Sequence, residues 1–300
     1  MVDLPDLGYF ADPFVLRTPS GYVAYGTAPQ GTETGSTRFR MALSSDLAHW
    51  QDAGGALVPV SGLGDDYWAP EVAFHEGRYF MYYSVGHGDR GHHLRVATSD
   101  APTGPFRDVG VNLTPDERFA IDAHPFRDVD GSWYLYYAHD VLTGPRVGTM
   151  LAVDRMVGMT ALAGEPRTIL RPDADWQVYE RERSMYGQVV DWHTLEGPSV
   201  VRRRGRYYCL FSGGAWGNET YGVSWAEADH PLGPWYRSPA NPRVLRTRHP
   251  DVVGPGHTSI TTAGDADVIA FHAWDAAHTA RRMHLAALEW GEDGPRVEGF

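Results

Sequence analysis

Residues 120–138 read AIDAHPFRDVDGSWYLYYA, a unit made of a polar head, a short apolar strand, a turn that closes at glycine and a strongly aromatic strand. The same order of parts recurs in four other stretches: FADPFVLRTPSGYVAYG (10–26), DYWAPEVAFHEGRYFMYYS (66–84), TLEGPSVVRRRGRYYCLFS (194–212) and VVGPGHTSITTAGDADVIAFHA (252–273). Such repetition at a roughly constant period is typical of repeat architectures.

The spacing of these units predicts the fold. Each unit takes roughly 50 to 75 residues, which is enough for four short antiparallel strands. Five such units predict an all-β protein, a five-bladed β-propeller that occupies residues 1–300 as a single domain. A pair of β-sandwiches would also show short strands and frequent turns. A sandwich has no reason, however, to repeat one strand-turn-strand unit five times in register.

Composition agrees with an all-β chain and narrows its partners. The 10 Trp, 16 Tyr and 11 Phe, with 34 Gly and 21 Pro, combine strand formers with turn formers. A net charge of −12, without a basic stripe, argues against binding nucleic acid. The start, MVDLPDLGYF, has no basic or apolar leader pattern, and no run of 18 apolar residues predicts a membrane span. We therefore expect a cytoplasmic protein, or a secreted one if a leader has been removed.

Three carboxylates share one place in the repeat. Counting nine residues back from the glycine of each turn reaches Asp12, Trp68, Asp122, Glu196 and Pro255. Taken singly, Asp12, Asp122 and Glu196 could each be a turn residue, a backbone bridge or a solvated side chain. In a propeller, however, the heads of the inner strands converge on one axis, so we expect the three acids to meet. Carboxylates held close together have separated pKa values, which glycosidic bond cleavage requires.

The heads also resemble a known family. In order along nearly the whole chain, five short motifs resemble those of the glycoside hydrolases of family 43: ADPF, YWAPEV, IDAHPF, LEGPSV and GPGHTS. The resemblance implies a five-bladed propeller that cleaves arabinose- and xylose-containing glycans with inversion. It implies that Asp12 is the general base, that Glu196 is the general acid, and that Asp122 raises the pKa of Glu196 and orients it. An inverting enzyme holds its base and acid about 6.5–9.5 Å apart.

Further residues are expected around these acids. The resemblance implies that His257, in GPGHTS, helps to hold a calcium ion in the central channel, largely through waters; no organic cofactor is expected. His124, two residues past Asp122, is expected to face the same channel. Trp68 is the first candidate for a sugar-stacking platform. Phe14 is the second candidate for this platform. Either Arg281 or Arg282 is expected to contact the terminal sugar, and Arg282 is favoured.

The segment 173–195 lengthens the spacing before the fourth head and is rich in Trp, Tyr, Arg and His, so we expect it to shape the leaving-group side. The resulting prediction is an exo-acting α-L-arabinofuranosidase on short α-1,5-linked arabino-oligosaccharides. A β-xylosidase and an endo-arabinanase are the near alternatives. A retaining sucrose- or fructan-cleaving enzyme would show an Asn-Asp-Pro-Asn head, and a non-catalytic sugar-binding propeller would not need all three acids. The oligomeric state is left open.

Overall fold

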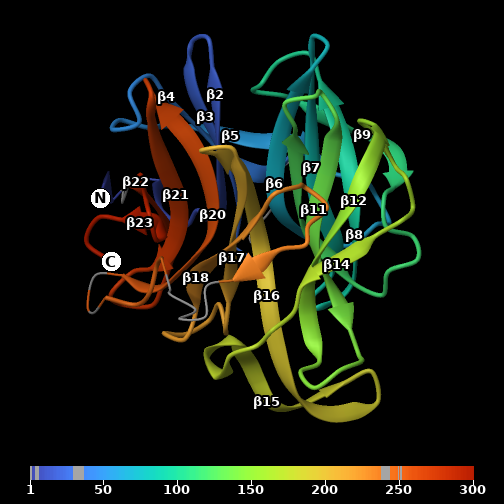
Figure 1. Cartoon of the computed structure of the whole chain (residues 1–300). Helices are drawn as coiled ribbons and strands as arrows, with labels where there is room; N and C mark the ends of the chain where they lie inside the picture. Colours follow the sequence, from blue (N-terminus) through green and yellow to red (C-terminus); the bar gives the residue numbers. More distant parts are fainter. Residues whose placement is uncertain (1, 4–6, 30–36, 238–243, 249, 251) are drawn as a thin grey trace.

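A computed structural model describes residues 2–3, 7–29, 37–237, 244–248, 250 and 252–300. Strands make up most of these residues, and a short 3₁₀ turn, Asp175–Gln177, is the only helical element whose full range lies among the described residues. The all-β prediction is confirmed (Figure 1). Within the described residues, no helix is long and apolar enough to cross a membrane.

Residues 11–112 form two antiparallel meanders. The first contains β2 (Ala11–Thr18), β3 (Gly21–Thr27), β4 (Arg38–Ser44) and β5 (Gln51–Val58). The second contains β6 (Asp66–His75), β7 (Arg78–His87), β8 (Arg90–Ser99) and β9 (Phe106–Asn112). A short parallel pairing of β5 with β9 joins the two meanders into one eight-stranded sheet.

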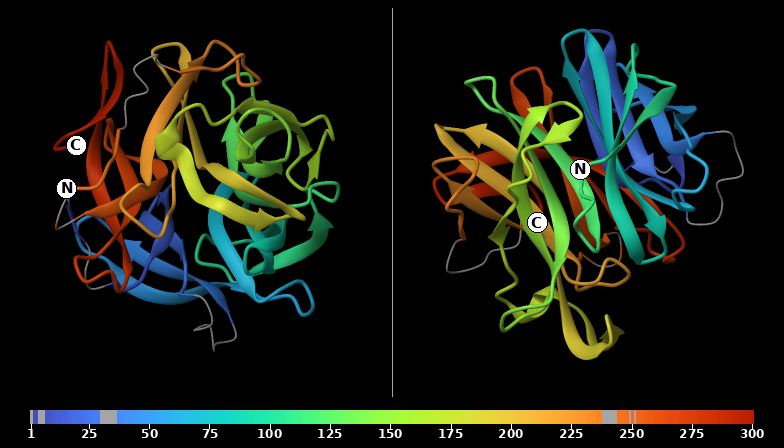
Figure 2. Two further views of the ribbon diagram at one scale, coloured as in Figure 1. Left: turned by 90° about the horizontal axis from the view of Figure 1, so that it is seen from below. Right: turned by 90° about the vertical axis from the view of Figure 1, so that its right-hand side faces the viewer.

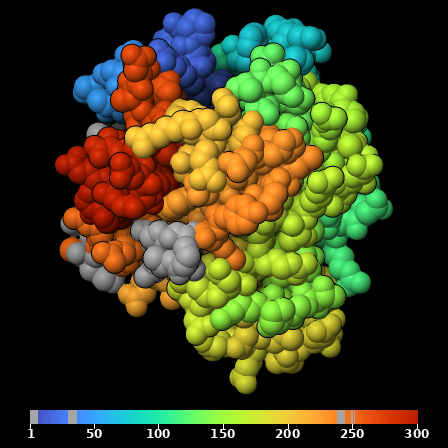
Figure 3. Space-filling model, viewed as in Figure 1, coloured from blue at the N-terminus to red at the C-terminus, as the bar shows by residue number. Residues whose placement is uncertain are grey.

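The next two meanders are also joined by a short parallel pairing, here between the third strand of one and the first strand of the other. The third contains β10 (Ala120–Arg127), β11 (Trp133–Val141) and β12 (Gly148–Gly158), with β13 (Ala161–Leu162) and β14 (Arg167–Leu170) along β12. The fourth contains β16 (Gln188–Arg203), β17 (Arg206–Gly213), β18 (Gly222–Ala228) and β19 (Tyr236–Arg237). β15 (Val178–Met185) pairs with the first half of β16. This β15–β16 hairpin extends past the rest of the sheets (Figures 1 and 3).

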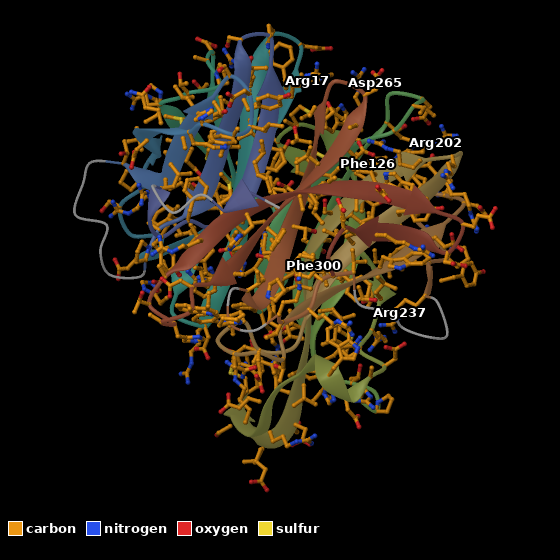
Figure 4. All side chains as sticks on the ribbon, turned by 90° about the vertical axis from the view of Figure 1, so that its left-hand side faces the viewer. Arg17, Phe126, Arg202, Arg237, Asp265 and Phe300 are labelled. Atoms are coloured by element: carbon orange, nitrogen blue, oxygen red, sulfur yellow. The ribbon has the colours of Figure 1, made fainter. Side chains whose placement is uncertain are left out.

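The last meander is completed by the start of the chain. It contains β20 (Val253–Ala263), β21 (Ala266–Trp274), β22 (Arg281–Gly291) and β23 (Gly294–Val297), and β1 (Val2–Asp3) pairs with β22. Side chains of the first meander also bond to the last: the Arg17 guanidinium donates to Thr262 Oγ1 at 2.9 Å and to the Gly264 carbonyl at 3.2 Å. Arg17 and the neighbouring Asp265 are labelled in Figure 4. The two ends of the chain therefore lie side by side (Figure 2).

Apolar side chains pack between neighbouring meanders. One cluster joins Phe126 and Tyr136 of the third meander to Phe211 of the fourth. The fourth and fifth meanders, the fifth and first, and the second and third share similar clusters. Because each meander buries both faces, its strands carry runs of aromatic residues instead of strict alternation. This propeller-like packing leaves the heads of the inner strands around one centre.

Candidate active site

β-Bulges aim the residues at the heads of the inner strands. In five described strands, the pairing with the next strand shifts between Ala11 and Phe14, Trp68 and Glu71, Ile121 and His124, Glu196 and Ser199, and Gly256 and Ser259. Each bulge holds one residue with a left-handed backbone: Asp12 (φ 49°), Ala69 (51°), Asp122 (61°), Gly197 (54°) and His257 (49°). Bulges of this kind re-aim a side chain and are frequent beside active sites.

The register counted from the turn glycines is wrong for three of the units. The glycines occupy different places in their turns: Gly77 and Gly205 are second in a two-residue turn, Gly264 is first, Gly131 lies in a longer loop and Gly21 begins β3. Trp68 and Glu196 therefore stand one residue before their bulges. In the last unit His257, instead of Pro255, takes the bulge position.

The structure nevertheless brings the three predicted carboxylates together. Asp12, Asp122 and Glu196 line one cavity of about 160 Å³, together with His257 and Arg281. Asp12 and Asp122 are buried, and Glu196 is partly exposed to the cavity. The Nδ1 atom of His257 lies 3.6 Å from Asp12 Oδ1 and 3.8 Å from Asp122 Oδ2. The side chains therefore face one another across a small space.

Asp12 is held in its ionised form. Burial alone would raise its pKa, but Arg281, His257 and His272 hold the pKa of Asp12 well below its ordinary value. Arg281 Nη1 donates to Asp12 Oδ1 at 3.3 Å, and its Nε donates to the Tyr9 hydroxyl at 2.8 Å. The Asp12 backbone N–H donates to His272 Nδ1 at 3.0 Å. Asp12 is therefore charged at neutral pH and able to accept a proton.

Glu196 has the opposite character. Burial, and then the neighbouring Asp122, raise the pKa of Glu196 to about 8. Burial, and then the charge of Asp12, raise the pKa of Asp122 to about 8 as well. The Tyr221 hydroxyl donates to Glu196 Oε1 at 2.6 Å, and the Gly197 N–H donates to Asp122 Oδ2 at 2.8 Å. The cavity thus pairs an ionised carboxylate with a carboxylic acid that keeps its proton at neutral pH.

The side chains around His257 do not form a calcium cage. Calcium prefers six to eight oxygen ligands, and no group of three or more His, Cys, Asp or Glu among the described residues is placed to hold a metal ion. The Nδ1 atom of the nearby His272 lies 3.0 Å from the Asp12 backbone N and 3.2 Å from Asp12 Oδ1, so Asp12 already occupies this ring nitrogen. A calcium ion bound directly by side chains therefore does not fit. The water-mediated ion implied by the resemblance stays a prediction, which elemental analysis of the purified protein would check.

Of the predicted sugar contacts, Trp68 lies in the cavity lining, stacked on His92 with 3.8 Å between ring centroids. The preference for Arg282 over Arg281 is corrected. Arg281 lines the cavity, whereas Arg282 donates to Asp275 Oδ2 at 3.1 Å in the turn before β22. Because neighbouring strand residues point to opposite faces, only one of the two arginines can face the cavity.

Phe14 and His124 also lie away from the cavity lining described here. Phe14 packs on Tyr25 in the core of the first sheet, with 6.4 Å between ring centroids. His124 is buried, faces Glu71 Oε2 at 2.8 Å and accepts the Val200 N–H at 3.0 Å. Both residues stand two positions after the left-handed residue of their bulge. His124 joins the second, third and fourth meanders through Glu71 and Val200.

Sequence reasoning did not name several residues of the lining. Tyr9 and Trp216 line one part of the cavity beside Arg281, whose guanidinium lies 4.6 Å from the Trp216 ring centroid. The lengthened segment before the fourth head contributes further lining residues: Tyr179, Arg183, Met185, Trp192 and Thr194. Its unusual length was a usable signal for these residues. Trp216 follows a strand in an ordinary loop and carries no comparable signal.

The cavity therefore holds a carboxylate with a lowered pKa and a carboxylic acid with a raised pKa. Glycoside hydrolases use such a pair of groups to cleave the glycosidic bond. Comparison with known proteins agrees. The model of the glycosyl hydrolases family 43 matches residues 7–295. The chain belongs to this family, and it is a glycoside hydrolase acting on O-glycosyl bonds.

Its relatives differ in what they cleave. A β-D-galactofuranosidase of Aspergillus niger is 30% identical, over 94% of this chain and 79% of that protein. An extracellular exo-α-(1→5)-L-arabinofuranosidase of Streptomyces avermitilis is 24% identical, over 95% of this chain but only 60% of that protein. Among solved structures, a thermostable family-43 glycoside hydrolase has a TM-score of 0.86 and 28% identity, covering 100% of this chain and 96% of that one. The family is therefore defined, whereas the sugar has to be argued from the site.

Proposed function

We propose that the protein is an inverting, exo-acting α-L-arabinofuranosidase that removes terminal arabinofuranosyl residues from short α-1,5-linked arabino-oligosaccharides. The observation that carries this proposal is the opposed protonation of Asp12 and Glu196 in one cavity. An inverting glycosidase needs one ionised carboxylate to activate water and one protonated carboxyl group for the leaving oxygen. We also infer five blades from the five bulged inner strands.

The proposed reaction assigns one proton transfer to each acid. Asp12 takes a proton from a water molecule as the water oxygen attacks the anomeric carbon. Glu196 gives its proton to the glycosidic oxygen as that bond breaks. The Tyr221 hydroxyl already bonds Oε1 of Glu196, so Oε2 is the oxygen left to carry the transferable proton. Arg281 keeps Asp12 ionised before the attack, and Asp122 anchors the backbone next to Glu196 through the Gly197 N–H.

Exo action is supported by contacts that join different segments of the cavity lining. The Arg281 guanidinium lies 5.4 Å from the Tyr9 ring and 4.6 Å from the Trp216 ring. Arg183 of the β15–β16 hairpin forms an ion pair with Asp89 in the turn between β7 and β8. These contacts join the lining residues of separate meanders. A closed pocket accepts a chain end, whereas an endo-acting enzyme needs a groove open at both ends.

A second candidate is a β-D-galactofuranosidase, favoured by the 30% identity to the Aspergillus niger enzyme of that name. Both candidates cleave terminal furanosides, and they differ in the size of the sugar that the small cavity must hold. The two candidates are distinguished by their rates on the matching aryl furanosides. The β-xylosidase and endo-arabinanase alternatives require a pyranose sugar and an open groove, respectively.

A substrate panel tests the proposal. The purified protein is assayed with 4-nitrophenyl α-L-arabinofuranoside, β-D-galactofuranoside and β-D-xylopyranoside, and with linear arabino-oligosaccharides. We expect the highest kcat/KM on the arabinofuranoside and release of single arabinose units from chain ends. Preference for the galactofuranoside would instead establish the second candidate. Internal cleavage of the oligosaccharides would overturn exo action, and Asp12→Ala serves as the inactive control.

A further inference from the structure

A second hollow lies at the other end of the first meander. This groove has a volume of about 490 Å³, and among the described residues it shares no lining residue with the catalytic cavity. Thr18, which lines the groove, stands six residues beyond Asp12 on β2, so about 20 Å of extended strand separates the groove from the carboxylates. In Figure 4, the neighbouring Arg17 lies at the opposite end of the molecule from the β15–β16 hairpin. The groove is therefore not a continuation of the catalytic cavity.

Two aromatic side chains form much of the apolar surface of this groove. Tyr22 and Trp50 are half-buried, because they pack against the core between the first and fifth meanders and also line the groove. Trp50 Nε1 donates to the Leu47 carbonyl at 3.0 Å, and the Tyr22 hydroxyl donates to the Thr262 carbonyl at 2.9 Å. These bonds fix the orientation of both rings. A fixed, partly exposed ring is suited to stacking on the C–H face of a sugar.

Uncharged hydrogen-bonding groups surround the two rings. Ser45, Gln51 and Thr103 are exposed in the groove, and within the part of the chain that the structure describes their side chains make no hydrogen bond. They supply hydroxyl and amide donors and acceptors for a ligand. None of the described lining residues is Asp, Glu or Arg, and the one histidine, His49, faces Asp46 Oδ2 at 2.9 Å. This lining suits a neutral ligand better than a nucleic acid or an acidic glycan.

The walls of the groove are held without a ligand. On the first meander, Asp46 Oδ1 accepts the His49 N–H at 2.8 Å and so fastens the loop before Trp50. The loop between β8 and β9 belongs to the second meander, and the Tyr25 hydroxyl of the first meander donates to its Pro102 carbonyl. A groove that is already formed loses little conformational entropy when it binds a ligand.

We propose that this groove is a second carbohydrate-binding site, which holds an uncharged polysaccharide chain outside the catalytic cavity. The lining supports a sugar ligand because it combines fixed aromatic surface with a few uncharged donors and acceptors. The chain is itself a glycoside hydrolase of family 43, and the inference does not depend on which terminal sugar it cleaves. A polymer held in the groove keeps its cleavable ends at a high effective concentration near the enzyme.

The test separates binding of a polymer from turnover of a small substrate. Trp50→Ala removes the larger ring, and Thr103→Arg places a long side chain in the groove from an exposed position. The matched control is Tyr236→Ala, because Tyr236 is an aromatic residue on β19 that is 57% exposed and lies outside the groove lining. Binding is measured by retardation in native gels that contain linear arabinan, arabinoxylan or a galactofuranan. For these gels every protein also carries Asp12→Ala, so that the polymer is not cleaved.

We expect at least one polymer to retard the Asp12→Ala protein. Trp50→Ala and Thr103→Arg should raise the apparent Kd for that polymer by about 10-fold, a loss typical of an anchor residue. Tyr236→Ala should have no effect. With Asp12 intact, kcat/KM of both groove variants on the preferred aryl glycoside should equal that of the wild type, which a general loss of structure would not allow.

Absence of retardation by all three polymers overturns the proposal, and so does unchanged retardation in both groove variants. Thermal melting checks the fold of each variant, and Thr103→Arg decides alone if Trp50→Ala is unfolded. A groove variant that changes the oligomeric state in size-exclusion chromatography would assign the groove to a second copy of the chain and would also overturn the proposal. Failure of the proposed function is seen separately, as a preference for another aryl glycoside.

Discussion

Replacing Arg281 by methionine removes the cation 3.3 Å from Asp12 Oδ1. Burial favours the protonated form of Asp12, and Arg281 is the first of the groups that oppose it. At that distance two unit charges interact by about 5 kcal/mol at an effective dielectric constant of about 20, an upper bound because water enters the gap. A carboxylate that loses an adjacent arginine is expected to titrate about 1 to 3 pH units higher. The acid limb of the rate profile should move upward by that amount.

The assay is kcat/KM on an aryl arabinofuranoside as a function of pH. The wild type should keep its activity to below about pH 4, because the pKa of Asp12 lies well below its ordinary value. Arg282→Met is the matched control, since Arg282 is the next residue and pairs with Asp275 instead. An unchanged acid limb in Arg281→Met, or an equal displacement in Arg282→Met, would refute the reasoning.

Three other predictions follow from the same structure. Glu196→Gln should lower kcat on arabino-oligosaccharides by about 10²- to 10⁴-fold, the usual contribution of a general acid, but far less on a 2,4-dinitrophenyl glycoside; equal losses on both would contradict its role. The wild-type rate should decline above a pH of about 8, where Glu196 loses its proton, and a limb near pH 4 to 5 would argue against the assignment. Ser259→Ala removes buried bonds to the Pro13 carbonyl at 2.8 Å and from the Val15 N–H at 3.2 Å. It should destabilise the fold by about 1–3 kcal/mol in thermal unfolding, whereas the exposed Ser20→Ala should have no effect.

The repeat predicted most of the architecture because its cause is local. A strand, a turn glycine and an aromatic strand are each readable from neighbouring residues, and packing on both faces explains the aromatic runs. The three acids could be predicted for the same reason, since each lies in a recognisable head. The count of nine residues back from the turn glycine was less accurate, because the position of a glycine within its turn depends on turn length. Asp12 therefore reaches the cavity from within its bulge, whereas Glu196 reaches it from the residue before its own bulge.

The rest of the cavity depends on contacts that no local pattern encodes. Arg281 and Arg282 are adjacent, and only the side-chain direction on β22 decides which one meets Asp12. Tyr221, the residue before β18, bonds Glu196 within the same meander. His124 carries a family-like motif but lies one layer lower, where Glu71 occupies its Nδ1. Long-range geometry, and not residue type, separates these roles.

The stereochemistry of the first product tests the central claim most directly. Hydrolysis of an α-L-arabinofuranoside is followed by ¹H NMR fast enough to see the product before it mutarotates. If Asp12 activates water while Glu196 protonates the leaving oxygen, the first arabinose formed is the β-anomer. Formation of the α-anomer first would require a covalent intermediate on the enzyme and would contradict the account.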